Sequence, residues 1–248
     1  MTAPFDAIGR YYDLLYLDKR YDAEVAYVDG LLKIYGRKVQ DLLEFGSGTG
    51  GHARLLTQLG YKVTGIERSV QMLARARASD GFVCLQGDAC TARLGRQFDA
   101  VIALFHVVSY QVRNKAVQAL FARAAEHLTP GGLFIFDVWY SPAVNTQRPE
   151  VRVKRLEKDD LEITRIAEPI VYPNENRVDV CYTVFVREAN SGEIQSFMET
   201  HPMRHFSLPE LDLLAESAGF ERVCAQEWLT GKEPSEASWG VCLVLVKS

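Results

Sequence analysis

The chain has 248 residues, enough for one large α/β domain, and its 48% hydrophobic and 24% charged residues are ordinary for a globular protein. Its formal net charge of −4 argues against an overall field built for nucleic acid. The apolar runs are too short to span a bilayer and the first residues lack the pattern of a secretory signal, so we expect a cytoplasmic protein with no membrane partner.

The first part of the chain is predicted to be helical. Residues 5–35 are rich in tyrosine, and Gly36 follows them as a residue that ends helices.

Strands and helices alternate over residues 38–139. We expect strands at 39–45, 61–66, 82–86, 98–105 and 133–139, and helices at 51–59, at 69–79 with Ser69 as the N-cap, and from Asn114 onward. Residues 129–132, Thr-Pro-Gly-Gly, are predicted to form a turn. Such alternation predicts a parallel, doubly wound sheet.

The pattern changes after Pro149. Residues 151–156, 162–172, 177–187 and 194–204 are strand-like and are separated by turns rather than helices, which predicts an antiparallel insertion. Ser207 and Glu210 have the spacing of a capping box that opens a helix, and Gly219 ends this helix. Two final strands are expected at 220–228 and 239–246.

The most informative motif is a glycine-rich loop after the first strand. Gly46, Gly48 and Gly51 match G-x-G-x-x-G, in which small residues let the backbone approach a ligand. Glu67 ends the second strand about twenty residues further on, where an acidic side chain can bind the hydroxyl groups of a ribose. Enzymes that use NAD and enzymes that use S-adenosylmethionine (SAM) share this arrangement, so an NAD-dependent oxidoreductase is one alternative.

Two further residues favour SAM. Glu44 precedes the first glycine, where a carboxylate would repel a pyrophosphate but suits a ligand that carries a sulfonium and an ammonium group. Gly87-Asp88-Ala89 follows the third strand, where Asp88 can accept a hydrogen bond from an adenine amino group.

This ordered set of motifs, completed by Thr129-Pro-Gly-Gly, resembles the class I SAM-dependent methyltransferases. The resemblance implies a seven-stranded, mostly parallel sheet with the order 3-2-1-4-5-7-6, and SAM as the cofactor. It implies that Gly46, Ser47 and Gly48 border the methionine part of SAM, and that Glu67 binds the ribose. It further places Arg68, Met72, Gly87, Asp88 and Ala89 around the adenine, and Leu104, Phe105 and His106 on the floor of the site.

Two segments narrow the resemblance to the amino-sugar N-methyltransferases. Residues 11–21 look like the N-terminal lid of that group, which adds Tyr16 to the cofactor site, and residues 199–204 resemble a segment of their insertion. The implied division is a helical lid at 1–37, a SAM-binding core at 38–149, an antiparallel substrate cap at 150–205 and completion of the core sheet at 206–248. On a strand, Glu199 and His201 share one face, which meets either the substrate or solvent.

Methyl transfer from a sulfonium requires that the acceptor be held in line and that a proton be removed from an amine. The candidate proton acceptors are His106, Tyr110, His201 and His205; relatives often have a histidine near the position of Tyr110. Trp139 and Tyr140 can form an aromatic wall for the substrate, and Glu199 and Arg204 are further candidates for substrate contacts.

The sequence lacks features of several methyltransferase classes. Leu104 is followed by Phe-His-Val-Val rather than by the Asn/Asp-Pro-Pro-Tyr motif used on nucleobases and amides, and the five cysteines have no metal-binding spacing. We therefore predict a small-molecule acceptor, such as the amine of a nucleotide-linked amino sugar, with no metal and with a homodimer as an expected assembly. The same motifs are also compatible with an O- or C-methyltransferase and with a non-catalytic SAM-binding protein.

Overall fold

A twisted sheet extends through the computed structural model, which describes residues 4–248; residues 1–3 of the predicted lid lie outside this range. Its core strands are β1 (Asp41–Phe45), β2 (Lys62–Glu67), β3 (Phe82–Gln86), β4 (Phe98–Ala103), β5 (Leu128–Tyr140), β10 (Phe220–Glu227) and β11 (Gly240–Lys247). They lie in the order β3-β2-β1-β4-β5-β11-β10, and β11 runs antiparallel to both of its neighbours. The predicted order 3-2-1-4-5-7-6 is confirmed.

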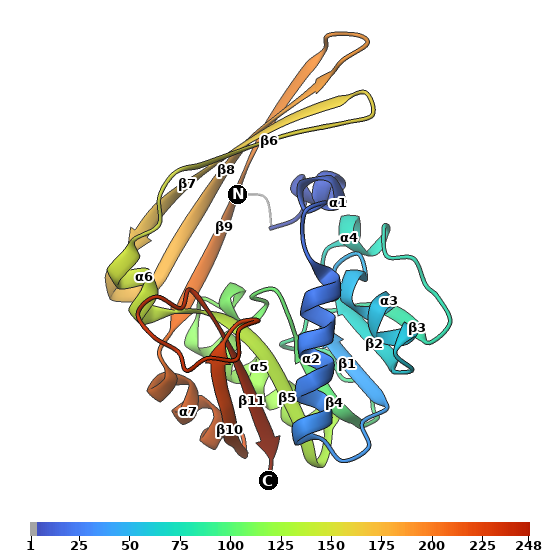
Figure 1. The fold of residues 1–248 in the computed structure, drawn as a ribbon, viewed down its shortest axis with the longest axis vertical. Helices are drawn as coiled ribbons and strands as arrows, with labels where there is room; N and C mark the ends of the chain where they lie inside the picture. The colour runs from blue at the N-terminus through green and yellow to red at the C-terminus, as the bar shows by residue number, and fades with distance from the viewer. Residues whose placement is uncertain (1–3) are drawn as a thin grey trace.

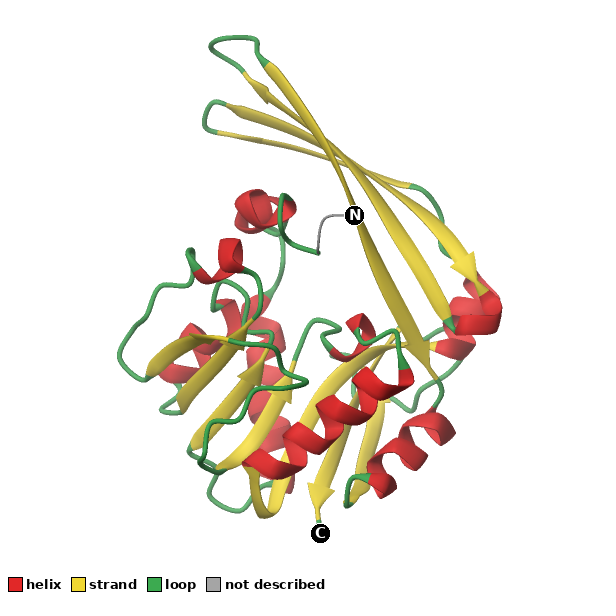
Figure 2. Ribbon diagram, turned by 180° about the vertical axis from the view of Figure 1, so that it is seen from behind, coloured by secondary structure: helices red, strands yellow, loops and turns green. Residues whose placement is uncertain are grey.

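Helices cover both faces of this core (Figures 1 and 2). On one face, α5 (Asn114–His127) and α7 (Leu208–Ser217) pack on Phe134 and Phe136. On the other, α2 (Tyr21–Tyr35) and α3 (Gly51–Gln58) pack in the cluster that contains Leu133 and Ile135. Successive residues of β5 therefore point to opposite layers, as expected for a strand that is buried on both sides.

The insertion forms four long antiparallel strands, β6 (Arg152–Lys158), β7 (Leu161–Tyr172), β8 (Arg177–Glu188) and β9 (Ile194–Phe206), which rise away from the core (Figure 1). All four agree with the predicted segments. The insertion is continuous with the core sheet, because β9 pairs with the last two residues of β5, Trp139 and Tyr140. This continuity is not predicted by the sequence: β5 continues to Tyr140, beyond Phe136, its last partner on β4, and β9 pairs with the edge that is free there.

Several local predictions need correction. The N-terminal helix is broken into η1 (Ile8–Tyr11), α1 (Tyr12–Leu15) and α2. Ser69 caps α4 (Val70–Leu73) through a 3.3 Å bond from the Met72 amide to its Oγ, but this helix ends six residues early, because residues 74–80 contain no large apolar side chain to bury. Residues 129–132 belong to β5, where the register shifts, rather than to a turn.

The helix after the insertion is present without its predicted capping box. The Ser207 side chain makes no capping hydrogen bond, and Glu210 accepts one from Arg204 Nη2 at 2.5 Å instead. Short elements that the sequence does not indicate are η2 (Val108–Tyr110), α6 (Ser141–Gln147) and η3 (Pro173–Glu175). Within residues 4–248, no helix is both long and apolar enough to cross a membrane.

Candidate cofactor and acceptor site

One cavity opens at the carboxyl ends of β1, β2, β3 and β4, which is where open α/β sheets bind ligands. Eleven residues predicted to contact SAM line it: Gly46, Ser47, Gly48, Glu67, Arg68, Met72, Gly87, Asp88, Ala89, Leu104 and Phe105. The parallel register explains this convergence, because residues that end neighbouring parallel strands meet at one edge.

The glycine loop has a backbone that other residues would strain. Gly46 has φ of +65°, and a Cβ at this position would lie 2.6 Å from a methyl carbon of Val107. The Gly48 amide donates to Glu67 Oε2 at 2.9 Å, and the Ser69 amide donates to Glu67 Oε1 at 2.7 Å. Burial raises the pKa of Glu67, opposed by these backbone bonds. Glu67 thus holds two walls of the cavity while each of its oxygens keeps a lone pair for a ligand hydroxyl.

Asp88 lines the cavity just after β3. Its Oδ1 accepts the Cys90 amide at 2.8 Å, and its Oδ2 lies 3.8 Å from Arg68 Nη1. The Asp88 side chain remains 40% exposed, so that its second oxygen can accept a hydrogen bond from a ligand.

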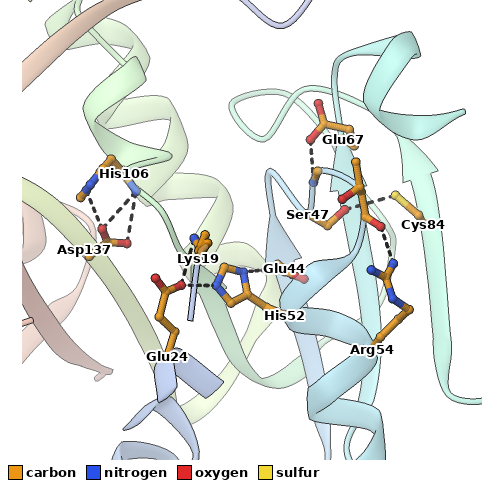
Figure 3. Close-up of polar contacts among 12 residues, drawn as sticks. Lys19, Glu24, Glu44, Ser47, His52, Arg54, Glu67, Cys84, His106 and Asp137 are labelled. Atoms are coloured by element: carbon orange, nitrogen blue, oxygen red, sulfur yellow. Dashed lines mark hydrogen bonds and ion pairs between the residues drawn. The ribbon is translucent and has the colours of Figure 1, made fainter. Parts of the chain in front are cut away.

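Two predicted cofactor residues do not line the cavity. Glu44 is 1% exposed and lies behind it, with Oε1 3.4 Å from His52 Nδ1 (Figure 3). Its Oε2 has no hydrogen-bond partner among the described residues. Tyr16 does not line the cavity either. Its ring packs edge-on against Phe105, a lining residue, with 5.2 Å between the ring centres, because the helix is interrupted between α1 and α2.

The candidate proton acceptors fall into three environments. Tyr110 lines the cavity, and its hydroxyl lies 2.8 Å from His201 Nδ1. His106 lies just outside the cavity, and its Nδ1 is 2.6 Å from Asp137 Oδ2 (Figure 3). Its ring also packs against the Trp139 ring. His205 is buried against Ser141, and burial lowers its pKa to about 4, which makes it a poor base at neutral pH.

The backbone before η2 is strained beside His106. Phe105 and His106 both have positive φ, 63° and 64°, a conformation that costs non-glycine residues of order 1 kcal/mol or more. Asp137 holds this turn, because its carboxylate accepts the His106 amide at 3.1 Å in addition to pairing with the ring.

Two predicted substrate contacts are engaged in contacts within the protein instead. Glu199 is 2% exposed and accepts hydrogen bonds from the amides of Phe5, Ala7 and Ile8, so it binds the N-terminal segment rather than a substrate. Arg204 bonds to Asn114 and Glu210, because even-numbered residues of β9 point away from the face that carries Glu199 and His201. Trp139 and Tyr140 end β5 outside the cavity, with the Trp139 ring against Trp239.

Other residues of the wall are not indicated by the motifs. Phe5, Tyr12 and Tyr21 come from the N-terminal segment, and His52 follows the glycine loop directly. The abundance of tyrosine before Gly36 is a signal for the first group; His52 carries none, because its role depends on contacts with α2 and β1.

Comparison with known proteins shows the family of the chain. A family model described as a methyltransferase domain matches residues 42–132. The dTDP-3-amino-3,4,6-trideoxy-alpha-D-glucopyranose N,N-dimethyltransferase of Streptomyces venezuelae is 31% identical over 212 residues, which cover 84% of this chain and 87% of the relative. The chain belongs to the SAM-dependent methyltransferase family.

Solved structures of other methyltransferases share the whole fold. DesVI from Streptomyces venezuelae superimposes with a TM-score of 0.80 at 25% identity, covering 96% of this chain and 97% of that one. CalS10, an amino pentose methyltransferase from Micromonospora echinaspora whose structure contains SAM, gives 0.78 at 25% identity and covers 100% and 99%.

The residues of this methyltransferase fit SAM. Glu44 Oε2 behind the glycine loop, which has no partner within residues 4–248, suits a cationic amino-acid moiety, Glu67 suits the ribose, and Asp88 suits the adenine. When bound, SAM supplies an electrophilic methyl group.

Proposed function

We propose that this methyltransferase acts on the amine of a nucleotide-linked amino sugar. The Streptomyces venezuelae relative is named for such a substrate, a dTDP-linked 3-amino sugar, and for N,N-dimethylation. DesVI and CalS10 share the insertion as well as the core, since each covers nearly the whole chain. The acceptor would lie between the cofactor cavity and the inner face of the insertion, with Trp139 and Tyr140 as one wall.

The observation that carries this proposal is a chain of hydrogen bonds from the insertion to the cavity wall. Glu199 Oε1 lies 2.6 Å from His201 Nε2, and His201 Nδ1 lies 2.8 Å from the Tyr110 hydroxyl. The bonds to His201 and to backbone amides lower the pKa of Glu199 although its burial acts in the opposite direction, so Glu199 is an ionised acceptor. His201 therefore donates through Nε2 and accepts the Tyr110 proton at Nδ1.

This tautomer lets Tyr110 act as a proton relay. Burial raises the pKa of Tyr110 well above its ordinary value, so the phenol keeps its proton, and Tyr110 is one of the residues that line the cavity. The methyl group would move from the sulfonium to the acceptor nitrogen, with the broken C–S bond leaving its electron pair on sulfur. The N–H proton would then move to the Tyr110 oxygen while the phenol proton moves to His201 Nδ1. The resulting imidazolium is stabilised by Glu199.

We also propose that the N-terminal segment acts as a lid and the insertion as a substrate cap. Pro4, Phe5 and Tyr12 line the cofactor cavity from outside the core. Glu199 of the insertion binds the amides of this segment, and Ser69 of the core donates to the Phe5 carbonyl at 3.1 Å. The N-terminal segment is therefore bonded both to the insertion and to the core, on the two sides of the cavity.

Turnover of labelled SAM tests the proposal. The protein is incubated with dTDP-linked 3-amino and 4-amino sugars, their hydroxyl analogues and free amino sugars, and the products are identified by mass spectrometry. Methylation of the nucleotide-linked amines is expected. Methylation of the hydroxyl analogues alone would instead establish an O-methyltransferase, and SAM binding without turnover of any acceptor would oppose the catalytic assignment.

A further inference from the structure

A buried histidine lies between two carboxylates at the methionine end of the cofactor cavity. His52, in the first turn of α3, has Nε2 2.6 Å from Glu24 Oε2 of α2 and Nδ1 3.4 Å from Glu44 Oε1 of β1 (Figure 3). All three side chains are almost inaccessible to solvent, and the His52 ring lines the cavity immediately after the glycine loop.

This arrangement favours a positively charged ring. A neutral imidazole has one N–H, whereas ionised carboxylates only accept hydrogen bonds, so both nitrogens must carry a proton to face both partners. Burial alone would lower the pKa of His52, but the bonds to Glu24 and Glu44 outweigh it and raise that pKa above its ordinary value.

Other ionisable groups surround this unit. Lys19 Nζ lies 2.9 Å from Glu24 Oε2 and 3.4 Å from the centre of the Phe105 ring, and the Tyr21 ring packs edge-on against His52 at 4.9 Å. Asp137 is near Lys19 but is paired with His106. Lys19 and His52 thus balance Glu24 and Glu44, and the unit is neutral without a ligand.

Binding of a cation would change the net charge around His52. Among the described residues Glu44 Oε2 has no hydrogen-bond donor, and the methyltransferase resemblance implies that the ammonium group of the cofactor would bind at the glycine loop, in front of this oxygen. A second positive charge next to buried His52 disfavours the imidazolium, and water cannot screen the repulsion in such a site. With a cation beside Glu44, His52 needs only the proton that it shares with Glu24.

We propose that His52 is a cofactor-binding residue that gives up a proton when the cationic amino-acid end of SAM binds. The proposal rests on the SAM-binding activity of the family and is independent of the acceptor, so it stands or falls separately from the proposed function. It requires reciprocity: if binding releases a proton, affinity must rise with pH. If His52 instead contacted the carboxylate of the ligand, binding would take up a proton rather than release one.

Calorimetry with S-adenosylhomocysteine decides between these signs. This probe keeps the ammonium group and cannot transfer methyl. Its binding enthalpy is measured between about pH 6 and pH 8 in pairs of buffers with different ionisation enthalpies, which gives the number of protons exchanged. Release of a fraction of a proton is expected, with the affinity rising by up to about tenfold per pH unit. Uptake, or no exchange across this range, would overturn the proposal.

Variants assign the proton to His52. His52→Gln should bind with an affinity that no longer depends on pH. His127→Gln is the matched control: it removes another buried histidine, whose ring bonds to the Leu94 amide and the Arg123 carbonyl, and should keep the wild-type slope. If His52→Gln does not fold, Glu24→Gln takes its place. It should shift proton release to lower pH, because His52 loses its nearer carboxylate, and an unshifted profile would refute the assignment.

Discussion

The hydroxyl of Tyr110 lies 2.8 Å from Nδ1 of His201, although 91 residues separate them in the chain. Tyr110 ends η2 at the edge of the core, and His201 lies in the middle of β9 in the insertion. The pair therefore joins the cofactor cavity to the insertion through one hydrogen bond.

Loss of this bond should slow methyl transfer without weakening cofactor binding. Tyr110→Phe and His201→Asn each remove the path for the proton, and kcat should fall by about 10²-fold or more, as is usual for general acid–base groups. The affinity for S-adenosylhomocysteine should stay close to that of the wild type. Steady-state kinetics and calorimetry on the same preparations measure both quantities.

The control for these variants is Tyr182→Phe. Tyr182 packs edge-on against the His201 ring at 4.9 Å, so the change keeps the ring contact and removes only a hydroxyl. Its kcat should match the wild type. Equal losses in Tyr182→Phe and Tyr110→Phe would mean that packing, rather than proton transfer, limits the reaction.

Glu199→Gln should loosen the N-terminal segment. The carboxylate accepts three backbone amides and His201, and an amide side chain cannot accept all of them with the same strength. The free energy of unfolding should fall by about 2 kcal/mol. Hydrogen exchange should accelerate at residues 5–8 more than at α5, which packs in the core cluster with Phe134 and Phe136. Uniform acceleration in both regions would argue against a local attachment.

Asp88→Ala should weaken cofactor binding more than it weakens folding. The Asp88 side chain is partly exposed, and its bond to the Cys90 amide is local, so the free energy of unfolding should change by less than about 1 kcal/mol. Loss of a hydrogen bond to adenine should raise the Kd for S-adenosylhomocysteine by about tenfold. Calorimetry and urea unfolding test the two parts, and an unchanged Kd would remove Asp88 from the adenine site.

Local sequence patterns predict the core because the spacing of apolar residues differs between its buried strands and its half-buried helices. Phe98 to Ala103 is almost continuously apolar because the strand is covered on both faces, and Val117, Leu120, Phe121 and Ala124 mark the buried face of α5 at helical spacing. The glycine loop, Glu67 and Asp88 follow from the same logic, since each comes at the end of a strand.

Contacts between distant segments escape such patterns. Glu199 looks like a surface residue of a strand until Phe5 to Ile8 are packed against it, and His52 looks like an ordinary helical residue until Glu24 approaches from α2. The early end of α4 and the edge pairing of β9 with β5 also depend on which side chains find a surface to bury. The spacing of residues along the sequence does not predict these long-range contacts.

Asp137 should stabilise the fold above acid pH and lose this effect as the pH falls. Burial would raise its pKa, but the charge and hydrogen bonds of His106 outweigh this and lower the pKa below the ordinary value. A carboxyl group with a lower pKa in the folded than in the unfolded state contributes its full stability above the unfolded pKa. That contribution disappears as the pH falls through the folded pKa. Wild-type stability should therefore decline below about pH 4.

Asp137→Asn should reduce this acid dependence and lower stability at neutral pH. The amide cannot hold both the His106 ring and its backbone amide as a carboxylate does, so the strained turn at Phe105 and His106 loses its support. A loss of about 2 kcal/mol is expected at pH 7, shrinking as the pH falls below the unfolded pKa and through the lower folded pKa of Asp137. Urea unfolding at several pH values measures the difference, with Asp160→Asn at an exposed turn as the control. A difference between wild type and Asp137→Asn that stays constant with pH would show that the Asp137 charge contributes nothing to stability.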